Sequence, residues 1–228
     1  EALFYAIEPF GRNLIKVAVT KSLSNELEFG LLDLKGKTVQ SCEYFELELI
    51  GDHILAGSYQ DTSVTYGILD SQFEVLVPIS YKTINEVQGH FIAKDAENLL
   101  QVFNRKGILV TDIKFDAYWI VGGYLEFSRK GAKGLIDLAE STLVHAAIYK
   151  SFSYTADGPQ PVLPKLWSIR ERDLSIKVQV HADSVVANGD LLIGFLNGQQ
   201  RVFKDSIEIF TNKHFDVKQS ERDLIVIQ

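Results

Sequence analysis

Short apolar stretches alternate with polar turns along most of the chain, and the period of the alternation is that of β-strands. In residues 44–49, Phe45, Leu47 and Leu49 fall on one face of an extended strand, with glutamates between them. Residues 66–70 are aromatic and β-branched in the way that strands prefer. These patterns predict three or four short strands in each segment of the chain and no helix.

The strands recur in a repeat of about 34 residues that carries three sequence markers. The first is a glycine, two apolar residues and an aspartate, and its third copy has Gln for Gly and Asn for Asp. Its final residues are separated by 37, 34 and 33 positions, and an aromatic residue follows each of them after 11 or 12 positions. A glycine before an apolar strand is the third marker. The markers are Asp33, Asp70, Asn104 and Asp137, then Tyr44, Tyr81, Phe115 and Tyr149, then Gly51, Gly89 and Gly123.

The first marker ends in a predicted hairpin turn. An Asp or Asn side chain bonds to the amides that follow it, and a glycine accepts the positive φ at the end of the turn. Gly36 and Gly107 supply that glycine in the first and third copies. The second and fourth copies have Phe73 and Glu140 there, which predicts looser turns.

The predicted fold is an all-β array of antiparallel β-meander or hairpin repeats. An open solenoid and a propeller-like closure both fit, although propeller blades commonly take about 40–45 residues. We expect a β-repeat region over residues 1–152, with four clear copies from about residue 29. Residues 153–164 hold three of the five prolines and predict a loop. Residues 165–228 are expected to form divergent repeats or a cap, with a fifth copy beginning at Leu166.

The markers resemble those of the WG-repeat family of bacterial proteins over about residues 10–152. That family's unit carries an aromatic–Gly step, an apolar strand, Asp, a Gly turn and then Tyr. The chain departs from it because no copy has Trp at the family's Trp position and two copies lack the turn glycine. The resemblance implies a β-repeat scaffold with interaction roles and no shared catalytic residues. The matching positions are Phe29-Gly30, Tyr66-Gly67, Asp33, Gly36, Tyr44, Tyr81 and Pro78.

Composition narrows the range of partners. Of 228 residues 46% are hydrophobic, which is enough for a core, and the net charge is −7. A negative chain is unsuited to nucleic acid and to anionic membrane surfaces. No apolar run reaches the roughly 18 residues of a membrane span, so we expect no membrane insertion. The single cysteine, Cys42, excludes an internal disulfide, and the compartment stays open between the cytoplasm and export.

Catalytic and metal signatures are missing from the sequence, and we predict no catalytic residue, cofactor or metal. His53 and His90 share one repeat position, but no third ligand is matched to them, which favours a structural role. The repeated aspartates suit turn capping better than calcium, which needs clustered oxygens. Glu46 and Glu48 form a solvated strand face more readily than a glycosidase pair.

Exposed aromatic residues are the remaining candidates for a binding site. Most aromatic side chains of a β-repeat are expected in its core. Some crowd around residue 120 and others flank the Pro-rich stretch, where they predict a ligand or partner patch. The candidates are Tyr118, Trp119, Tyr124, Tyr154 and Trp167.

The favoured hypothesis for function is a non-catalytic β-repeat module that presents a surface to a protein partner. The alternative is a carbohydrate-binding module or glycan-acting enzyme that uses aromatic platforms. That alternative predicts a pocket with two carboxylates beside an exposed tryptophan. A third hypothesis is a piece of a larger protein whose active domain lies elsewhere.

Overall fold

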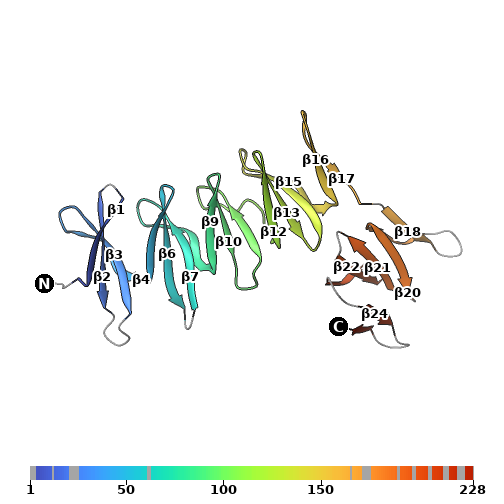
Figure 1. The fold of residues 1–228 in the computed structure, drawn as a ribbon, viewed down its shortest axis with the longest axis horizontal. Helices are drawn as coiled ribbons and strands as arrows, with labels where there is room; N and C mark the ends of the chain where they lie inside the picture. Colours follow the sequence, from blue (N-terminus) through green and yellow to red (C-terminus); the bar gives the residue numbers. More distant parts are fainter. Residues whose placement is uncertain are drawn as a thin grey trace. The chain divides into compact units, whose positions relative to one another are not determined.

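A computed structural model of the chain confirms the all-β prediction (Figure 1). It describes residues 4–11, 13–20, 26–60, 63–164, 166–170, 176–188, 191–196, 199–204, 207–212, 216–219 and 224–227. These residues form strands and turns, and none of them is helical. The described part accordingly has no helix that could cross a membrane. The chain divides into two compact units, residues 1–114 and 115–228.

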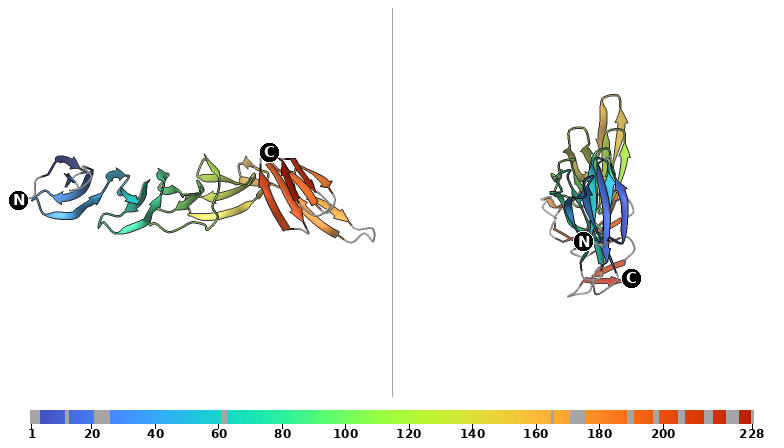
Figure 2. Two further views of the ribbon diagram at one scale, coloured as in Figure 1. Left: turned by 90° about the horizontal axis from the view of Figure 1, so that it is seen from below. Right: turned by 90° about the vertical axis from the view of Figure 1, so that its left-hand side faces the viewer.

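The first unit consists of three antiparallel meanders, in which each strand pairs with its neighbour in sequence. The first meander is β1 (Ala6–Phe10), β2 (Leu14–Thr20), β3 (Leu27–Asp33) and β4 (Thr38–Tyr44). The second is β5 (Glu46–Ile50), β6 (His53–Gln60), β7 (Ser63–Leu69) and β8 (Val75–Tyr81). The third is β9 (Thr83–Val87), β10 (His90–Lys94) and β11 (Leu100–Phe103). Within this unit the meanders follow one another in chain order, blue to green in Figure 2.

The second unit contains two four-stranded meanders and three two-stranded hairpins. Its first meander is β12 (Ala117–Val121), β13 (Tyr124–Arg129), β14 (Ala132–Asp137) and β15 (Thr142–Tyr149). The hairpins are β16 (Ser151–Thr155) with β17 (Gly158–Val162), β18 (Leu166–Arg170) with β19 (Ile176–His181), and β24 (Asp216–Gln219) with β25 (Leu224–Ile227). The other meander is β20 (Ser184–Asn188), β21 (Leu191–Leu196), β22 (Gln199–Lys204) and β23 (Ile207–Asn212).

Two local expectations for the C-terminal part differ from the structure. Residues 153–164 were expected to be a loop, yet most of them lie in the β16–β17 hairpin. Pro159 and Pro161 are tolerated there because β17 pairs on one side only, so their missing amide protons break no ladder. The fifth copy was expected from Leu166, but β18 pairs with β19 alone and the next meander begins at Ser184.

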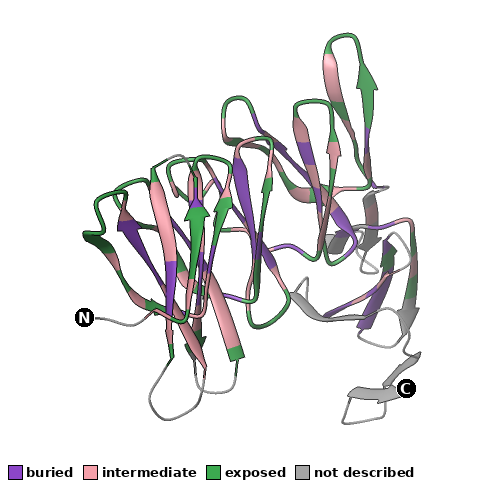
Figure 3. Ribbon diagram, turned by 60° about the vertical axis from the view of Figure 1, so that its left-hand side comes forward, coloured by how far each residue is buried: buried purple, intermediate pink, exposed green. Residues whose placement is uncertain are grey.

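The core of the first unit lies between neighbouring meanders, as the repeat predicts (Figure 3). Each cluster combines side chains from two successive sheets, and Tyr44 and Tyr81, the aromatic markers, are buried in them. In this unit the meanders therefore bury their apolar rows against one another, and each is stabilised by the next copy. One cluster is Phe10, Leu31, Tyr44, Leu47, Ile54, Ala56 and Leu69, and the other is Ile68, Val77, Tyr81, Ile84, Phe91, Ala93 and Phe103.

The repeated glycine is explained by a bulge in the strand that pairs with it. On β3, Phe29 faces Tyr44 and Leu31 faces Gln40, so β4 carries two extra residues opposite Gly30. The same bulge lies opposite the corresponding glycines of β7 and β14. A Cβ at Gly30 would come within 2.7 Å of backbone atoms of β4. At Gly30 and Gly67 the glycine is required because the bulged strand occupies the space of a side chain, whereas at Gly134 the Phe127 ring occupies that space.

The repeated Asp and Asn residues cap the turns, which confirms the sequence prediction. The amides of Lys35 and Lys37 donate to Asp33 Oδ1 at 2.9 Å. Asp70 accepts from the amides two and four residues on, at 2.8 and 2.9 Å, and Asn104 does so at 2.9 and 3.0 Å. Asp137 accepts from the amides two and three residues on, at 2.8 and 3.0 Å. Turn capping thus accounts for each of these side chains.

The second turn is not looser than the first, contrary to the prediction from its missing glycine. Phe73 adopts φ +68°, beside +81° for Gly36 and +74° for Gly107. Its amide donates to the carbonyl of Asp70 at 3.0 Å, as the amide of Gly36 does to that of Asp33 at 2.9 Å. A non-glycine residue in this region carries about 1–3 kcal/mol of strain. The fourth turn does differ in length. Asp137 pairs with Thr142, five residues on, whereas in the first turn the amide of Asp33 donates to the carbonyl of Lys37, four residues on.

Candidate functional site

An aromatic and ionic cluster lies on one face of the β12–β15 meander, and we call it the Trp119 cluster: Trp119, Glu126, Lys133 and Tyr154. Trp119 on β12 faces Glu126 on β13, and its side chain is 48% exposed. Lys133 Nζ lies 3.4 Å from the centroid of the Trp119 ring and 3.1 Å from Glu126 Oε1. The lysine therefore links the indole to the carboxylate through a cation–π contact and an ion pair.

The β16–β17 hairpin contributes the fourth member of the Trp119 cluster. Tyr154, on β16, donates its hydroxyl to Glu126 Oε2 at 3.2 Å. The base of the hairpin is tied to β15, because the Phe152 ring stacks on His145 at 5.6 Å between centroids. Near its tip, a Cβ built on Gly158 would lie 3.9 Å from the Tyr124 hydroxyl. The hairpin thus brings Tyr154 and Tyr124 to the same part of the meander.

The ionic pair inside the cluster is largely shielded from water. The side chains of Glu126 and Lys133 are 14% and 18% exposed, and each has a second partner in the cluster. Desolvation, and then the charge and the hydrogen bond of Glu126, raise the pKa of Tyr154 to about 12. The phenol therefore stays protonated at neutral pH and remains a donor to Glu126.

Replacing Glu126 should lower the pKa of Tyr154. In Glu126→Gln we expect it to fall from about 12 toward the ordinary tyrosine value of 10.0, because the carboxylate charge is gone. NMR titration of the Tyr154 ring carbons in the wild type and in Glu126→Gln measures this change. In the wild type the raised pKa contributes stability below about pH 10 that is lost as the pH rises from 10 to 12. A Tyr154 titration unaltered by Glu126→Gln would contradict the hydrogen bond.

Two of the five predicted patch residues lie elsewhere. Tyr118 is half-buried and pairs with Phe127, so it points to the opposite face of the sheet from Trp119. Trp167 is half-buried, donates its indole N–H to the Ala182 carbonyl at 3.1 Å, and packs on the Val180 cluster of the C-terminal part. The structure therefore brings together Trp119, Tyr124 and Tyr154, and places Tyr118 and Trp167 in packing roles.

Sequence reasoning missed Glu126 and Lys133. The only dense basic stretch, residues 128–133, was interpreted as a solvated hairpin tip, and Glu126 sits between two buried apolar residues. A hairpin centred on Lys130 and Gly131 pairs residue 126 with 135 and residue 128 with 133. That register puts Glu126 and Lys133 diagonally on one face of the sheet. Locating the centre of the hairpin in the sequence would therefore have predicted that these two side chains are neighbours.

The residues considered for metal or nucleophilic chemistry serve structural purposes. His53 packs edge-on against Phe91 at 5.1 Å, and buried His90 has its Nδ1 3.2 Å from the Gln88 carbonyl oxygen. In the part of the chain that the structure describes, no three His, Cys, Asp or Glu side chains are grouped to hold a metal. Burial, and then the charge of Glu28, raises the pKa of the Cys42 thiol, which keeps it protonated.

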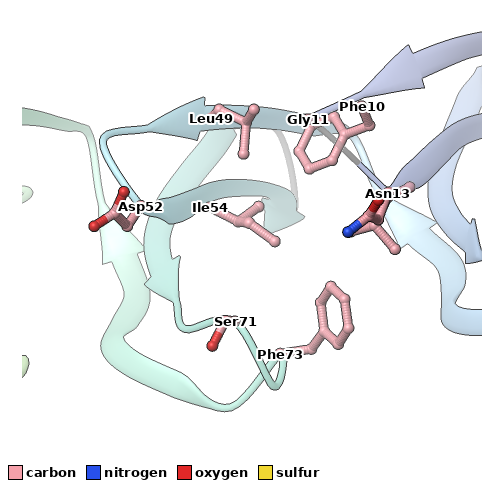
Figure 4. Close-up of a pocket in the computed structure, with 9 residues that line it drawn as sticks. Phe10, Gly11, Asn13, Leu49, Asp52, Ile54, Ser71 and Phe73 are labelled. Atoms are coloured by element: carbon pink, nitrogen blue, oxygen red, sulfur yellow. The ribbon is translucent and has the colours of Figure 1, made fainter.

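A second surface feature is a pocket of about 210 Å³ between the first two meanders, which we call the Phe73 pocket (Figure 4). Apolar side chains make up most of its wall, and Asn13, Asp52 and Ser71 supply polar groups. The wall comes from the β1–β2 turn, the ends of β5 and β6, and the turn between β7 and β8. The apolar members are Phe10, Leu14, Leu49, Ile54 and Phe73.

A smaller pocket of about 60 Å³ lies between the same meanders and bears on the carbohydrate hypothesis. It is lined by three glutamates, Glu26, Glu28 and Glu43, and by Phe45 and Tyr59, whose rings meet edge-on at 4.6 Å. Neither this pocket nor the Phe73 pocket is lined by a tryptophan. The combination of paired carboxylates with an exposed tryptophan that the carbohydrate hypothesis predicts is therefore not present in these two pockets.

Comparisons with known proteins do not add a functional assignment. No protein-family model matches the chain, and no curated protein matches its sequence. Among solved structures, a WD40 β-propeller domain of Doa1 is similar at 10% identity and a TM-score of 0.28, over 85% of this chain and 72% of that one. BamB from Moraxella catarrhalis is similar at 11% identity and a TM-score of 0.29, over 94% and 76%.

A eukaryotic initiation factor is similar at 10% identity and a TM-score of 0.39, over 96% of this chain. This chain spans only 56% of that protein. At such TM-scores these three likenesses have no bearing on function.

Proposed function

We propose that the chain is a non-catalytic binding module, of the kind found in WG-repeat proteins, that presents the Trp119 cluster to a protein partner. The exposed indole carries the proposal. Tryptophan and tyrosine are enriched among the residues that dominate binding energy at protein interfaces. Lys133 and Glu126 hold the ring in place before binding, which reduces the conformational entropy that association would otherwise lose.

The strand that carries Trp119 also supports an interface. β12 stands at the edge of its sheet, and its sequence Ala-Tyr-Trp-Ile-Val has no charged residue. The first strands of the meanders in the first unit, β1, β5 and β9, each contain a glutamate, a common protection of edge strands against pairing with other chains, whereas β20, like β12, contains no charged residue. β12 lacks this protection, and both Trp119 and Val121 are exposed on it. An uncharged apolar edge beside a fixed indole suits a protein partner.

Affinity capture from cells that express the tagged chain, followed by quantitative mass spectrometry, tests the proposal. The variants are Trp119→Ala and, as matched control, Val144→Ala, a 43% exposed residue on β15 of the same meander. We expect at least one protein to be retained by the wild type and by Val144→Ala, and to fall at least about tenfold with Trp119→Ala. Purified partner and chain should then bind directly with the same dependence.

Equal retention by all three chains would contradict the proposal. A glycan array run with the same variants addresses the carbohydrate alternative. Saturable glycan binding that disappears in Trp119→Ala, without a protein partner, would replace the protein-binding proposal with that alternative.

A further inference from the structure

The Phe73 pocket owes one wall to a residue in an unfavourable backbone conformation. Phe73 occupies the left-handed position that Gly36 and Gly107 fill in the equivalent turns. Glycine adopts this conformation without steric conflict, whereas an aromatic residue does not. The ring is partly buried against the cluster that contains Phe10 and Ile54. Backbone strain of this kind is concentrated at binding sites, which directs attention to what the ring lines.

The pocket is an open apolar hollow with a carboxylate among its lining residues. Phe10 and Ile54 are about 5% and 4% exposed, while Leu49 is 52% exposed. In Figure 4, Phe73 lies across the pocket from Phe10 and Leu49, and Ile54 lies between them. Since an apolar cavity of about 150 Å³ accommodates benzene, a pocket of about 210 Å³ has room for one large apolar side chain.

The next junction, between the second and third meanders, is more tightly occupied at the matching positions. Gly11 and Gly51 both have positive φ in the turns after the first strands of their meanders. A Cβ on Gly11 would lie 3.5 Å from Leu49 Cδ1, whereas one on Gly51 would lie 2.6 Å from a Glu86 carboxylate oxygen. At the third turn, a Cβ on Gly107 would lie 2.4 Å from the Leu76 carbonyl oxygen. The approach of the Leu76 backbone leaves little room at the third turn, and the first junction also differs by having Leu49 near Gly11, where the second has the carboxylate of Glu86 near Gly51.

Charge favours a cationic occupant beside the apolar one. Asp52 is paired with Arg105, but the two side chains are 79% and 61% exposed. An ion pair so exposed contributes little stability, so another cation can take the place of Arg105. The net charge of −7 favours approach of a positive segment.

We propose that the Phe73 pocket binds one leucine- or phenylalanine-sized side chain of a peptide segment, with a neighbouring Lys or Arg of that segment paired to Asp52. The site involves none of the residues of the Trp119 cluster. The two proposals can therefore fail separately, and Trp119→Ala should leave binding at the Phe73 pocket unchanged.

Methyl NMR with three capped dipeptides tests the inference on the full chain. The probes are acetyl-Phe-Lys-amide, acetyl-Phe-Glu-amide and acetyl-Ala-Lys-amide, and the reporters are the methyl groups of Leu14, Leu49 and Ile54. We expect acetyl-Phe-Lys-amide to shift all three reporters with a Kd of about 1 mM. The glutamate probe should bind at least about threefold more weakly, and the alanine probe should not saturate, because it lacks the apolar group.

Variants assign the two parts of the site. Leu49→Gln should weaken acetyl-Phe-Lys-amide at least about fivefold, while Val75→Gln, also at an exposed apolar residue, should not. Asp52→Asn should remove the preference of the pocket for the lysine probe over the glutamate probe. Arg105→Ala should strengthen that preference, because Asp52 then has no competing partner in this ion pair. The inference is overturned if the reporters do not shift, if the alanine probe binds as well as the phenylalanine probe, or if Leu49→Gln binds like the wild type. Unchanged amide spectra outside the pocket establish that Leu49→Gln is folded.

Discussion

Replacing Gly67 with alanine is expected to lower the free energy of unfolding by about 2 kcal/mol, within the range of overpacked cores. A Cβ at this buried position would lie 2.6 Å from the Val77 carbonyl oxygen and 2.6 Å from Ile79 Cγ1. Both atoms belong to the bulged strand β8, whose backbone has no room to retreat without breaking the ladder to β7. Urea unfolding followed by circular dichroism measures the change.

Gly123→Ala is the matched control for this prediction. A Cβ there would meet no atom within 4 Å, so its effect should stay within about 0.5 kcal/mol. If Gly67→Ala were as harmless as Gly123→Ala, the bulge would not be the reason for the repeated glycine.

Replacing Asp70 with alanine is expected to lower the free energy of unfolding by about 1–2 kcal/mol. The carboxylate accepts two amide hydrogen bonds within the turn, each with a net contribution of about 0.5–1.5 kcal/mol. Those bonds also hold Phe73 at positive φ, so their loss releases the strained residue. Asn104→Ala removes the same pair of bonds from a turn closed by glycine, and should have an effect of similar size.

Thermal or urea unfolding of both variants measures the loss, with Asp157→Ala as control. Asp157 is an exposed aspartate in the turn of the β16–β17 hairpin, and its replacement should change stability by less than about 0.5 kcal/mol. Equal stabilities for Asp70→Ala and Asp157→Ala would show that the repeated aspartates are not caps.

The repeat and its turns could be predicted from sequence because they depend on local chemistry. Side-chain capping and a positive-φ glycine involve residues within four positions of each other. Both features are visible in the sequence of the first turn, as Asp33 and Gly36. Phe73 misled the prediction because its conformation is maintained by Asp70 and by packing against the first meander, which no local pattern reveals. The structure also explains why Gln101 can stand where the other copies have glycine. The third meander lacks a strand equivalent to β4 or β8, so no bulged strand takes up the space of the Gln101 side chain.

The candidate site was only partly predictable, since it depends on strand register and on contacts between distant segments. Trp119 was found because the crowding of aromatic residues around residue 120 is visible in the sequence. Tyr118 was wrongly grouped with it in space, because neighbouring residues on a strand point to opposite faces. Tyr154 reaches Glu126 across 28 positions through a hairpin whose prolines indicated a loop. Sequence patterns alone do not contain that contact.

Native-state hydrogen exchange, measured by NMR on the wild-type chain, is the most direct test that one turn geometry recurs in register. The amides of Lys37, Glu74 and Ile108 donate to Asp33, Asp70 and Asn104 at 2.9, 2.9 and 3.0 Å. We expect these three turn amides to exchange at similar rates, each at least about tenfold slower than in an unstructured peptide. Protection of Lys37 and Ile108 together with unprotected exchange at Glu74 would contradict the account, because the turn that contains Phe73 would then be open.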